Sequence, residues 1–343
     1  MNTIKLMLVM AFAITLAACF PSNNSAKTEV LLQGRTMGTT YNIKVVSTLE
    51  QVKSLELQSK IDAALKQVNQ EMSTYIPDSE ISLFNKSQST LAVEISPGFA
   101  RVLKESLRLG ELSHGKLDIT VGPLVNLWGF GPEQRPETVP SDELLAATKS
   151  RIGLSHLQLV DKKLSKKLPS LYIDLSTIAK GYGVDVVAEL IEANGITNYL
   201  VEIGGEMRLR GFKHTGELWA IAIEKPILDP SGEQRAVHQV IIPKDNAVAT
   251  SGDYRNYFEA DGQRFSHIID PETGTPINHN LVSVTVITSS SMTADGLSTA
   301  LMVMGVEQGM AFAKENDLAA LFISKSDNGF KEQFTVKFKQ YLK

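Results

Sequence analysis

The stretch that decides the fold is residues 171–194, which read LYIDLSTIAKGYGVDVVAELIEAN. Its first three residues, Leu171 to Ile173, predict a strand that ends at Asp174. Small residues follow directly and lead into a helix that we expect over about 177–194. The fold therefore joins strands and helices along one continuous piece of chain.

The flanking segments supply helices and strands in no regular order. Apolar residues at a three-to-four spacing predict an amphipathic helix over about 55–72: Leu57, Ile61, Leu65, Val68 and Met72. A second helix is expected from Pro97 to Leu112, with proline in its first turn. Further apolar patterns predict a helix at 294–304 and strands around 41–45, 218–220, 282–286 and 319–324. Because strands and helices do not alternate regularly, we expect an α+β fold rather than a doubly wound sheet.

The composition narrows the class of protein. Of 343 residues, 43% are hydrophobic and 21% are charged, which excludes a disordered chain. The 34 basic and 38 acidic residues give a net charge of −4, which argues against a nucleic-acid partner because such a protein needs a basic face. The single cysteine excludes a disulfide framework and any zinc or iron–sulfur site built from several cysteines.

That single cysteine lies in what reads as a lipoprotein signal. Lys5 is followed by an apolar run of eleven residues, 6–16, which is shorter than the ~20 residues of a membrane span. Leu16-Ala17-Ala18-Cys19 resembles a bacterial lipobox, so we expect a signal peptide at 1–18, lipidation of Cys19, a flexible tether over 19–27 and one domain over 28–343. The protein would then be anchored on the periplasmic side of a bacterial membrane. The alternative is ordinary secretion with a chance cysteine.

Two segments offer groups that suit phosphate and metal chemistry. The helix start before Gly181 presents unpaired N–H groups, and Lys180 adds a positive charge, which together favour an anion such as phosphate. Farther along, Asp295 and Thr299 are four residues apart on one helix face, a carboxylate and a hydroxyl that suit Mg²⁺. The alternatives are a capped helix with a solvated lysine, and an aspartate that stabilises its own helix.

A third segment, residues 266–274, carries a candidate general base. A strand is expected to end in the turn Pro271-Glu272-Thr273-Gly274, and His267 lies just before it. A lone histidine is more often structural. Paired glycines before Glu206 allow a ligand to approach the backbone, or form a tight turn, and Tyr75 offers a ring that could stack on a flat ligand or simply pack.

Taken together and in this order, these segments resemble the ApbE family, the FAD:protein FMN transferases. The resemblance covers nearly all of the chain after the tether. It is carried by Gly34–Tyr41, Met72–Tyr75, Asp118–Val125 with Leu127–Gly131, Asp174–Gly181, Gly204–Glu206, Ala249–Tyr254, His267–Gly274 and Thr293–Thr299. The fold it implies is ApbE-like and T-fold-related, with mixed sheets packed against helices.

The resemblance also implies a reaction. FAD is split at its pyrophosphate, FMN is joined through a phosphoester to a threonine of a target protein, and AMP leaves. Family targets are membrane subunits of the Nqr and Rnf respiratory complexes. By resemblance, FAD, as the substrate, is lined by Met37, Tyr75, Lys116, Leu117, Asp118, Asp174, Lys180, His267 and Ile269, and Mg²⁺ is held by Asp295, Ser298, Thr299 and the Thr177 carbonyl.

Three matters stay open from the sequence. Either His267 or Asp295 could serve as the general base for the acceptor hydroxyl. A Mg²⁺-dependent FAD pyrophosphatase, which passes FMN to water, would use overlapping motifs. A flavin-binding lipoprotein without catalysis would not require the metal residues that the chain carries.

Overall fold

The computed structural model describes residues 26–131, 139–226, 236–253, 257–260, 263–327 and 329–343. The predicted signal peptide, Cys19, most of the tether and Tyr254 lie outside the described residues. Within the described ranges, no helix has both the length and the apolar character needed to cross a bilayer.

An eight-stranded sheet forms the centre of the fold, and every neighbouring pair in it is antiparallel. Its strands, in spatial order, are β1 (Thr28–Thr36), β2 (Thr39–Ser47), β6 (Tyr199–Ile203), β7 (Glu206–Arg210), β10 (Ala247–Gly252), β13 (Leu281–Thr288), β14 (Ala319–Ser326) and β15 (Gly329–Phe334). The α+β class expected from the sequence is confirmed.

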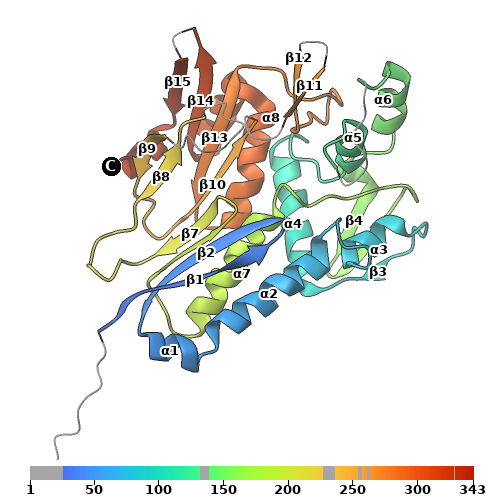
Figure 1. Cartoon of the computed structure of the whole chain (residues 1–343). Coiled ribbons are helices and arrows are strands. Elements are labelled where there is room, and N and C mark those ends of the chain that lie inside the picture. The colour runs from blue at the N-terminus through green and yellow to red at the C-terminus, as the bar shows by residue number, and fades with distance from the viewer. Residues whose placement is uncertain (1–25, 132–138, 227–235, 254–256, 261–262, 328) are drawn as a thin grey trace, which may run out of the picture.

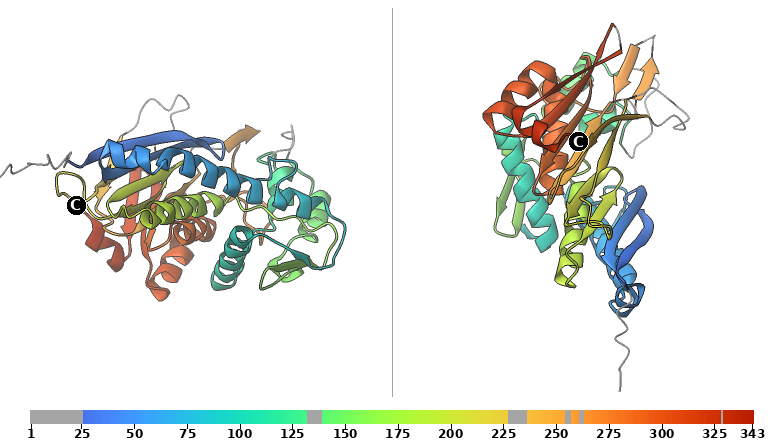
Figure 2. Two further views of the ribbon diagram at one scale, coloured as in Figure 1. Left: turned by 90° about the horizontal axis from the view of Figure 1, so that it is seen from below. Right: turned by 90° about the vertical axis from the view of Figure 1, so that its left-hand side faces the viewer.

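Three long helices pack together against one face of this sheet: α2 (Leu57–Met72), α7 (Ala179–Ala193) and α8 (Ser291–Glu315). Figures 1 and 2 show α7 beside both α2 and α8, with α4 (Pro97–Leu112) next to α8. The remaining helices are α1 (Leu49–Ser54), α3 (Glu80–Lys86), α5 (Gly122–Leu127), α6 (Asp142–Lys149) and the 3₁₀ turns η1 (Leu154–His156) and η2 (Val336–Tyr341).

The sheet is covered on both faces. Along β14, Ala320 and Phe322 belong to the core under the helices, whereas Leu321 and Ile323 belong to a separate core on the opposite face. That second core is closed by the hairpin β8 (Ile221–Glu224) and β9 (Val237–Ile241) and by η2. Two smaller sheets complete the fold: β3 (Val93–Glu94) with β5 (Lys163–Lys166) and β4 (Leu157–Val160), and β11 (Tyr257–Ala260) with β12 (Gln263–Ser266).

The helices expected at 55–72 and 97–112 are confirmed, but three expected strands are wrong. Residues 171–174 form no strand, because the backbone of Ile173 bonds to the side-chain amide of Asn85 at 2.8 Å in both directions. Leu218 makes only an isolated bridge, and the strand begins at Ile221. The strand before the 271–274 turn, β12, ends at Ser266, so His267 lies beyond it.

Helix α8 runs well past the expected end at residue 304, but it is broken at Gly305. That residue has φ 73° and ψ −173°, a conformation that favours glycine. His279 lies against the break, with its Nε2 2.9 Å from the carbonyl oxygen of Met302. The segment of α8 before this break carries Asp295, Ser298 and Thr299.

Candidate active site

The centre of the site is a close contact between the starts of α7 and α8. The amide N–H of Gly181 donates to Oδ2 of Asp295 at 2.9 Å. A methyl group at residue 181 would lie 2.4 Å from the carbonyl oxygen of Ser291, so only glycine permits this approach. The predicted anion site and the predicted metal site are therefore one place.

Lys180 lies between two buried carboxylates. Its ammonium is 2.9 Å from Oε1 of Glu206, which begins β7, and 3.8 Å from Oδ1 of Asp295. Burial raises the pKa of Asp295 above its ordinary value, against the opposing effects of Lys180 and the Gly181 amide. Burial likewise raises the pKa of Glu206 to about 7, although Lys180 opposes this. One lysine does not offset two buried carboxylates, so the site favours a further positive charge.

Hydroxyl groups gather on the adjoining turn of α8. The Ser251 hydroxyl, at the end of β10, is 2.6 Å from that of Ser298 and 3.3 Å from that of Thr299. The Ser298 hydroxyl also donates to the backbone oxygen of Asp295 at 2.9 Å. A buried face of α8 thus presents a carboxylate and hydroxyls one turn apart, as the four-residue spacing predicts.

Three buried oxygen atoms of this region have no hydrogen-bond partner: Oγ1 of Thr177, Oε2 of Glu206 and Oγ of Ser291. Buried polar atoms are normally paired, and an orphaned oxygen is explained by a missing ion or water. The donors are all oxygens, a set that suits Mg²⁺. Among the described residues, no three His, Cys, Asp or Glu side chains gather to hold a metal, so a cation here would depend on one carboxylate with hydroxyl and carbonyl oxygens. The residues therefore fit the predicted Mg²⁺ in the chemical type of their donor atoms, which are all oxygens.

A second group of predicted residues lies next to this centre. Lys116 reaches Glu272 at 2.8 Å and Asp270 at 3.3 Å, so it holds the turn that follows His267. The Asp118 carboxylate accepts from the amide of Thr120 at 2.7 Å, and the amide of Asp174 donates to the Ile119 carbonyl at 2.7 Å. The segment 174–180 thus connects this group to Lys180 and Asp295.

The other predicted flavin residues are placed differently from one another. Met37, in the β1–β2 turn, reaches α7 beside Gly183. The side chains of Leu117 and Ile269 are buried in hydrophobic clusters, so only their backbone could face a ligand. Tyr75 is 70% exposed in the turn after α2. His267 lies edge-on to the ring of Phe130, with 6.3 Å between ring centroids.

Sequence reasoning missed several residues that build the site. Glu206 and Ser251 lie in segments that the resemblance marked, but nothing in their local pattern shows that they meet Lys180 and Ser298. The local pattern around Gly181 does not reveal its role either, because that role depends on contact with α8, more than 100 residues later in the chain. Only the sheet, which places β7 and β10 side by side, brings these groups together.

Comparison with known proteins decides the family. The family model described as "ApbE family" matches residues 37–322, which is most of the chain. The chain belongs to the ApbE family. The resemblance expected from its motifs is thereby confirmed, and the matched range includes every predicted flavin and metal residue.

ApbE relatives match over nearly the whole chain. The FAD:protein FMN transferase of Vibrio cholerae is 53% identical over 336 residues, 98% of each chain. The Escherichia coli K12 protein of the same name is 42% identical over 342 residues, 97% of this chain and 96% of the relative. The solved flavin transferase ApbE from Vibrio cholerae has a TM-score of 0.85 over 92% of this chain and 100% of its own, at 53% identity. The apo flavinyl transferase ApbE of Pseudomonas stutzeri has a TM-score of 0.84 at 39% identity, over 92% and 97%.

Proposed function

We infer that this protein is an FAD:protein FMN transferase, the activity named for relatives that match nearly its whole length. The observation in this chain that carries the inference is the contact of two helix starts, where Lys180 meets the buried carboxylate of Asp295. Transfer of a phosphoryl group depends mainly on positioning and charge neutralisation, and this contact concentrates the groups for both.

We propose that the site works with Mg²⁺ held by Asp295, Ser298, Thr299 and the carbonyl of Thr177. The charge deficit around Lys180 supports a cation at this place, and the orphaned oxygens near it, Oγ1 of Thr177 and Oε2 of Glu206, support a bound ion or water there. When bound, Mg²⁺ would polarise the pyrophosphate and neutralise its charge. The Lys180 ammonium would hold pyrophosphate oxygens. The unpaired amides expected at this helix start are largely bonded within the protein, because the amide of Ala179 donates to the Leu175 carbonyl at 2.8 Å and that of Gly181 to Asp295 at 2.9 Å.

The proposed step joins an acceptor threonine to FMN. The threonine hydroxyl oxygen attacks the FMN-side phosphorus of FAD, the bond from that phosphorus to the bridging oxygen breaks, and AMP leaves with that oxygen. We assign the threonine proton to His267 rather than to Asp295. The reason is that the two carboxylate oxygens of Asp295 already face the Gly181 amide and the Lys180 ammonium.

The proposed partners are membrane subunits of the Nqr and Rnf type. A lipid anchor on Cys19 would keep the enzyme at the membrane surface where such subunits present their threonine.

The exposed ring of Tyr75 supports a flavin as the bound ligand, because an accessible aromatic ring can stack on a flat ligand.

The function is tested by incubating the mature protein with FAD, Mg²⁺ and a threonine-bearing acceptor domain of this type. We expect the acceptor to gain the mass of FMN by a phosphoester, with one AMP released per acceptor. The matched control is the same acceptor with that threonine replaced by alanine, which should stay unmodified. Release of free FMN and AMP with no change in the acceptor would instead establish a pyrophosphatase.

The anchor is tested separately. We expect the wild-type protein to take up a radioactive fatty acid in cells and to sediment with membranes, because Cys19 carries the lipids. Cys19→Ser should lose both the label and membrane sedimentation while keeping FMN transfer in solution, since the proposed metal site is built from residues 177–299. A Cys19→Ser protein that still takes up label would refute the lipidation.

A further inference from the structure

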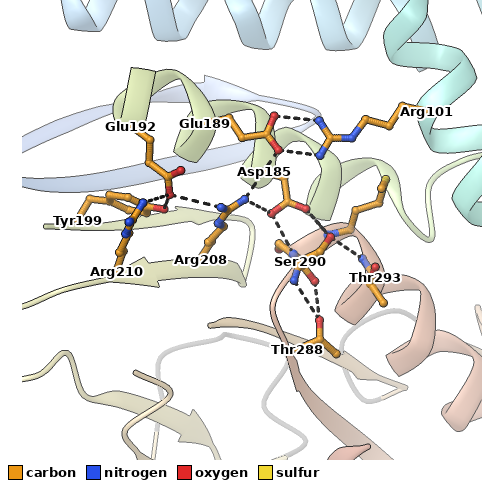
Figure 3. A network of polar contacts seen from close by, with 12 residues as sticks. Arg101, Asp185, Glu189, Glu192, Tyr199, Arg208, Arg210, Thr288, Ser290 and Thr293 are labelled. Atoms are coloured by element: carbon orange, nitrogen blue, oxygen red, sulfur yellow. Dashed lines mark hydrogen bonds and ion pairs between the residues drawn. The ribbon is translucent and has the colours of Figure 1, made fainter. Parts of the chain in front are cut away.

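Asp185 lies in α7, one turn after Gly181, and contacts the start of α8 with both carboxylate oxygens. It accepts from the backbone amides of Ser291 and Met292, each at 3.0 Å, and from the Ser290 hydroxyl at 2.7 Å. Figure 3 shows this carboxylate between Ser290 and Arg208. It therefore serves as the acceptor that the unpaired first amides of α8 need.

The rest of the first turn of α8 is satisfied around the same group. The Ser290 hydroxyl, which donates to Asp185, accepts from the amide of Thr293 at 3.3 Å. The Thr293 hydroxyl in turn donates to Glu105 of α4 at 2.6 Å. Asp185 thus acts as a cap supplied by another helix, whereas Ser290 is the cap from the helix's own chain.

The two contacts between α7 and α8 have a fixed register. Gly181 pairs with Asp295, and Asp185, four residues later, pairs with Ser291 and Met292, about one turn earlier in α8. The helices therefore run antiparallel here, and both contacts lie on consecutive turns. Holding the first amides of α8 in place fixes the height and rotation of the helix, and with them the direction of the Asp295 carboxylate.

Asp185 is fully buried, and its charge is paired with Arg208 of β7, whose Nη1 is 3.1 Å away. Arg208 has further partners in Glu192 at 3.4 Å and Glu189 at 3.9 Å. Figure 3 shows how these carboxylates surround the guanidinium. Because Arg208 keeps two acidic partners without Asp185, loss of the Asp185 charge leaves no unpaired arginine.

We propose that Asp185 is a positioning residue for the metal site, because it fixes the start of α8 and so aims Asp295. The inference rests on the proposed function for the identity of the metal, but the placement of α8 by Asp185 does not. Asp185 would then act on the site indirectly, through α8, which carries the proposed metal ligands, and not by touching flavin or cation.

The test compares Asp185→Asn with Glu189→Gln, a matched control on the same helix. Glu189 belongs to the same charge network, but its ion pairs are with Arg101 and Arg208. Among the described residues it makes no hydrogen bond or ion pair with α8. Hydrogen exchange of metal-free protein should speed up over residues 290–299 in Asp185→Asn and stay unchanged there in Glu189→Gln. Asp185→Glu, which keeps the charge but moves the carboxylate oxygens, should change exchange in the same direction and serves if Asp185→Asn does not fold.

Mn²⁺ affinity and kcat are the measurements that distinguish a positioning role from a purely structural one, because a purely structural role would leave both unchanged. Mn²⁺ alone, followed by electron paramagnetic resonance, should bind Asp185→Asn about 10–100-fold more weakly, as for other groups that orient metal ligands. FAD affinity without metal should stay within about twofold, and raised Mg²⁺ should recover part of the lost kcat, since mispositioned ligands weaken metal binding without removing it.

The outcomes separate this inference from the function it rests on. Unchanged exchange over 290–299, or faster exchange with wild-type Mn²⁺ affinity, would overturn the positioning role. An equal loss of Mn²⁺ binding in Glu189→Gln would also overturn it, because the effect would then belong to the whole network. If the wild type binds no Mn²⁺, the metal assignment fails, and unchanged kcat in Asp185→Asn would then overturn the positioning role as well.

Discussion

Asp295→Asn is expected to abolish FMN transfer while the protein stays folded. The substitution keeps an oxygen that can accept the Gly181 amide, which now donates to Oδ2 at 2.9 Å, and it keeps the shape of the side chain. It removes the one carboxylate that the proposed metal site contains. Loss of a single electrostatic contact at a reacting centre lowers kcat by about 10²–10³-fold, and loss of a metal ligand should reach at least that range.

The measurement is the mass of the acceptor after incubation with FAD and Mg²⁺, beside the thermal melting of each variant. Thr299→Ala is the matched control on the same helix face, and it should be milder because water can replace a neutral hydroxyl. Chelation of the wild type with EDTA should reproduce the effect of Asp295→Asn, and added Mg²⁺ should rescue the wild type alone. Full transfer by chelated wild type, or by Asp295→Asn, would remove the metal from the mechanism.

The local parts of the fold could be predicted because they depend on local patterns. The spacing of apolar residues places α2 and α4 at their observed positions, and the pairing of Asp295 with Thr299 on one face follows from helix geometry alone. The strand expected at 171–174 fails for the opposite reason. Its apolar residues do enter the core, but the backbone bonds to Asn85, an amide 88 residues away that no local pattern reveals.

The candidate site shows the same division. The sequence predicts that Lys180 is at a helix start and near an anion, but not that Glu206 and Asp295 are the carboxylates beside it. Those contacts arise because β7 and α8 converge on the start of α7. The family resemblance supplied the site's residues, and the structure supplies the physical reason why they act together.

Gly181→Ala is expected to damage both stability and transfer, although alanine favours helices. The new methyl group would lie 2.4 Å from the Ser291 carbonyl oxygen and 2.8 Å from Cβ of Asp295, so the starts of α7 and α8 must separate. Overpacking of this kind costs about 1–3 kcal/mol of unfolding free energy. The gain from replacing glycine in a helix is about 0.5–1 kcal/mol, so a net loss remains.

Gly183→Ala is the control that isolates this contact. It lies in the same helix and gains the same helix propensity, but its new methyl group would meet the far end of the flexible Met37 side chain, at 2.8 Å from Cε. That chain can turn aside, whereas the backbone carbonyl of Ser291 cannot. Chemical denaturation should therefore show Gly181→Ala clearly less stable than Gly183→Ala. Equal stability of the two variants would mean that α7 and α8 can separate without cost, and that glycine at 181 does not hold Asp295 in place.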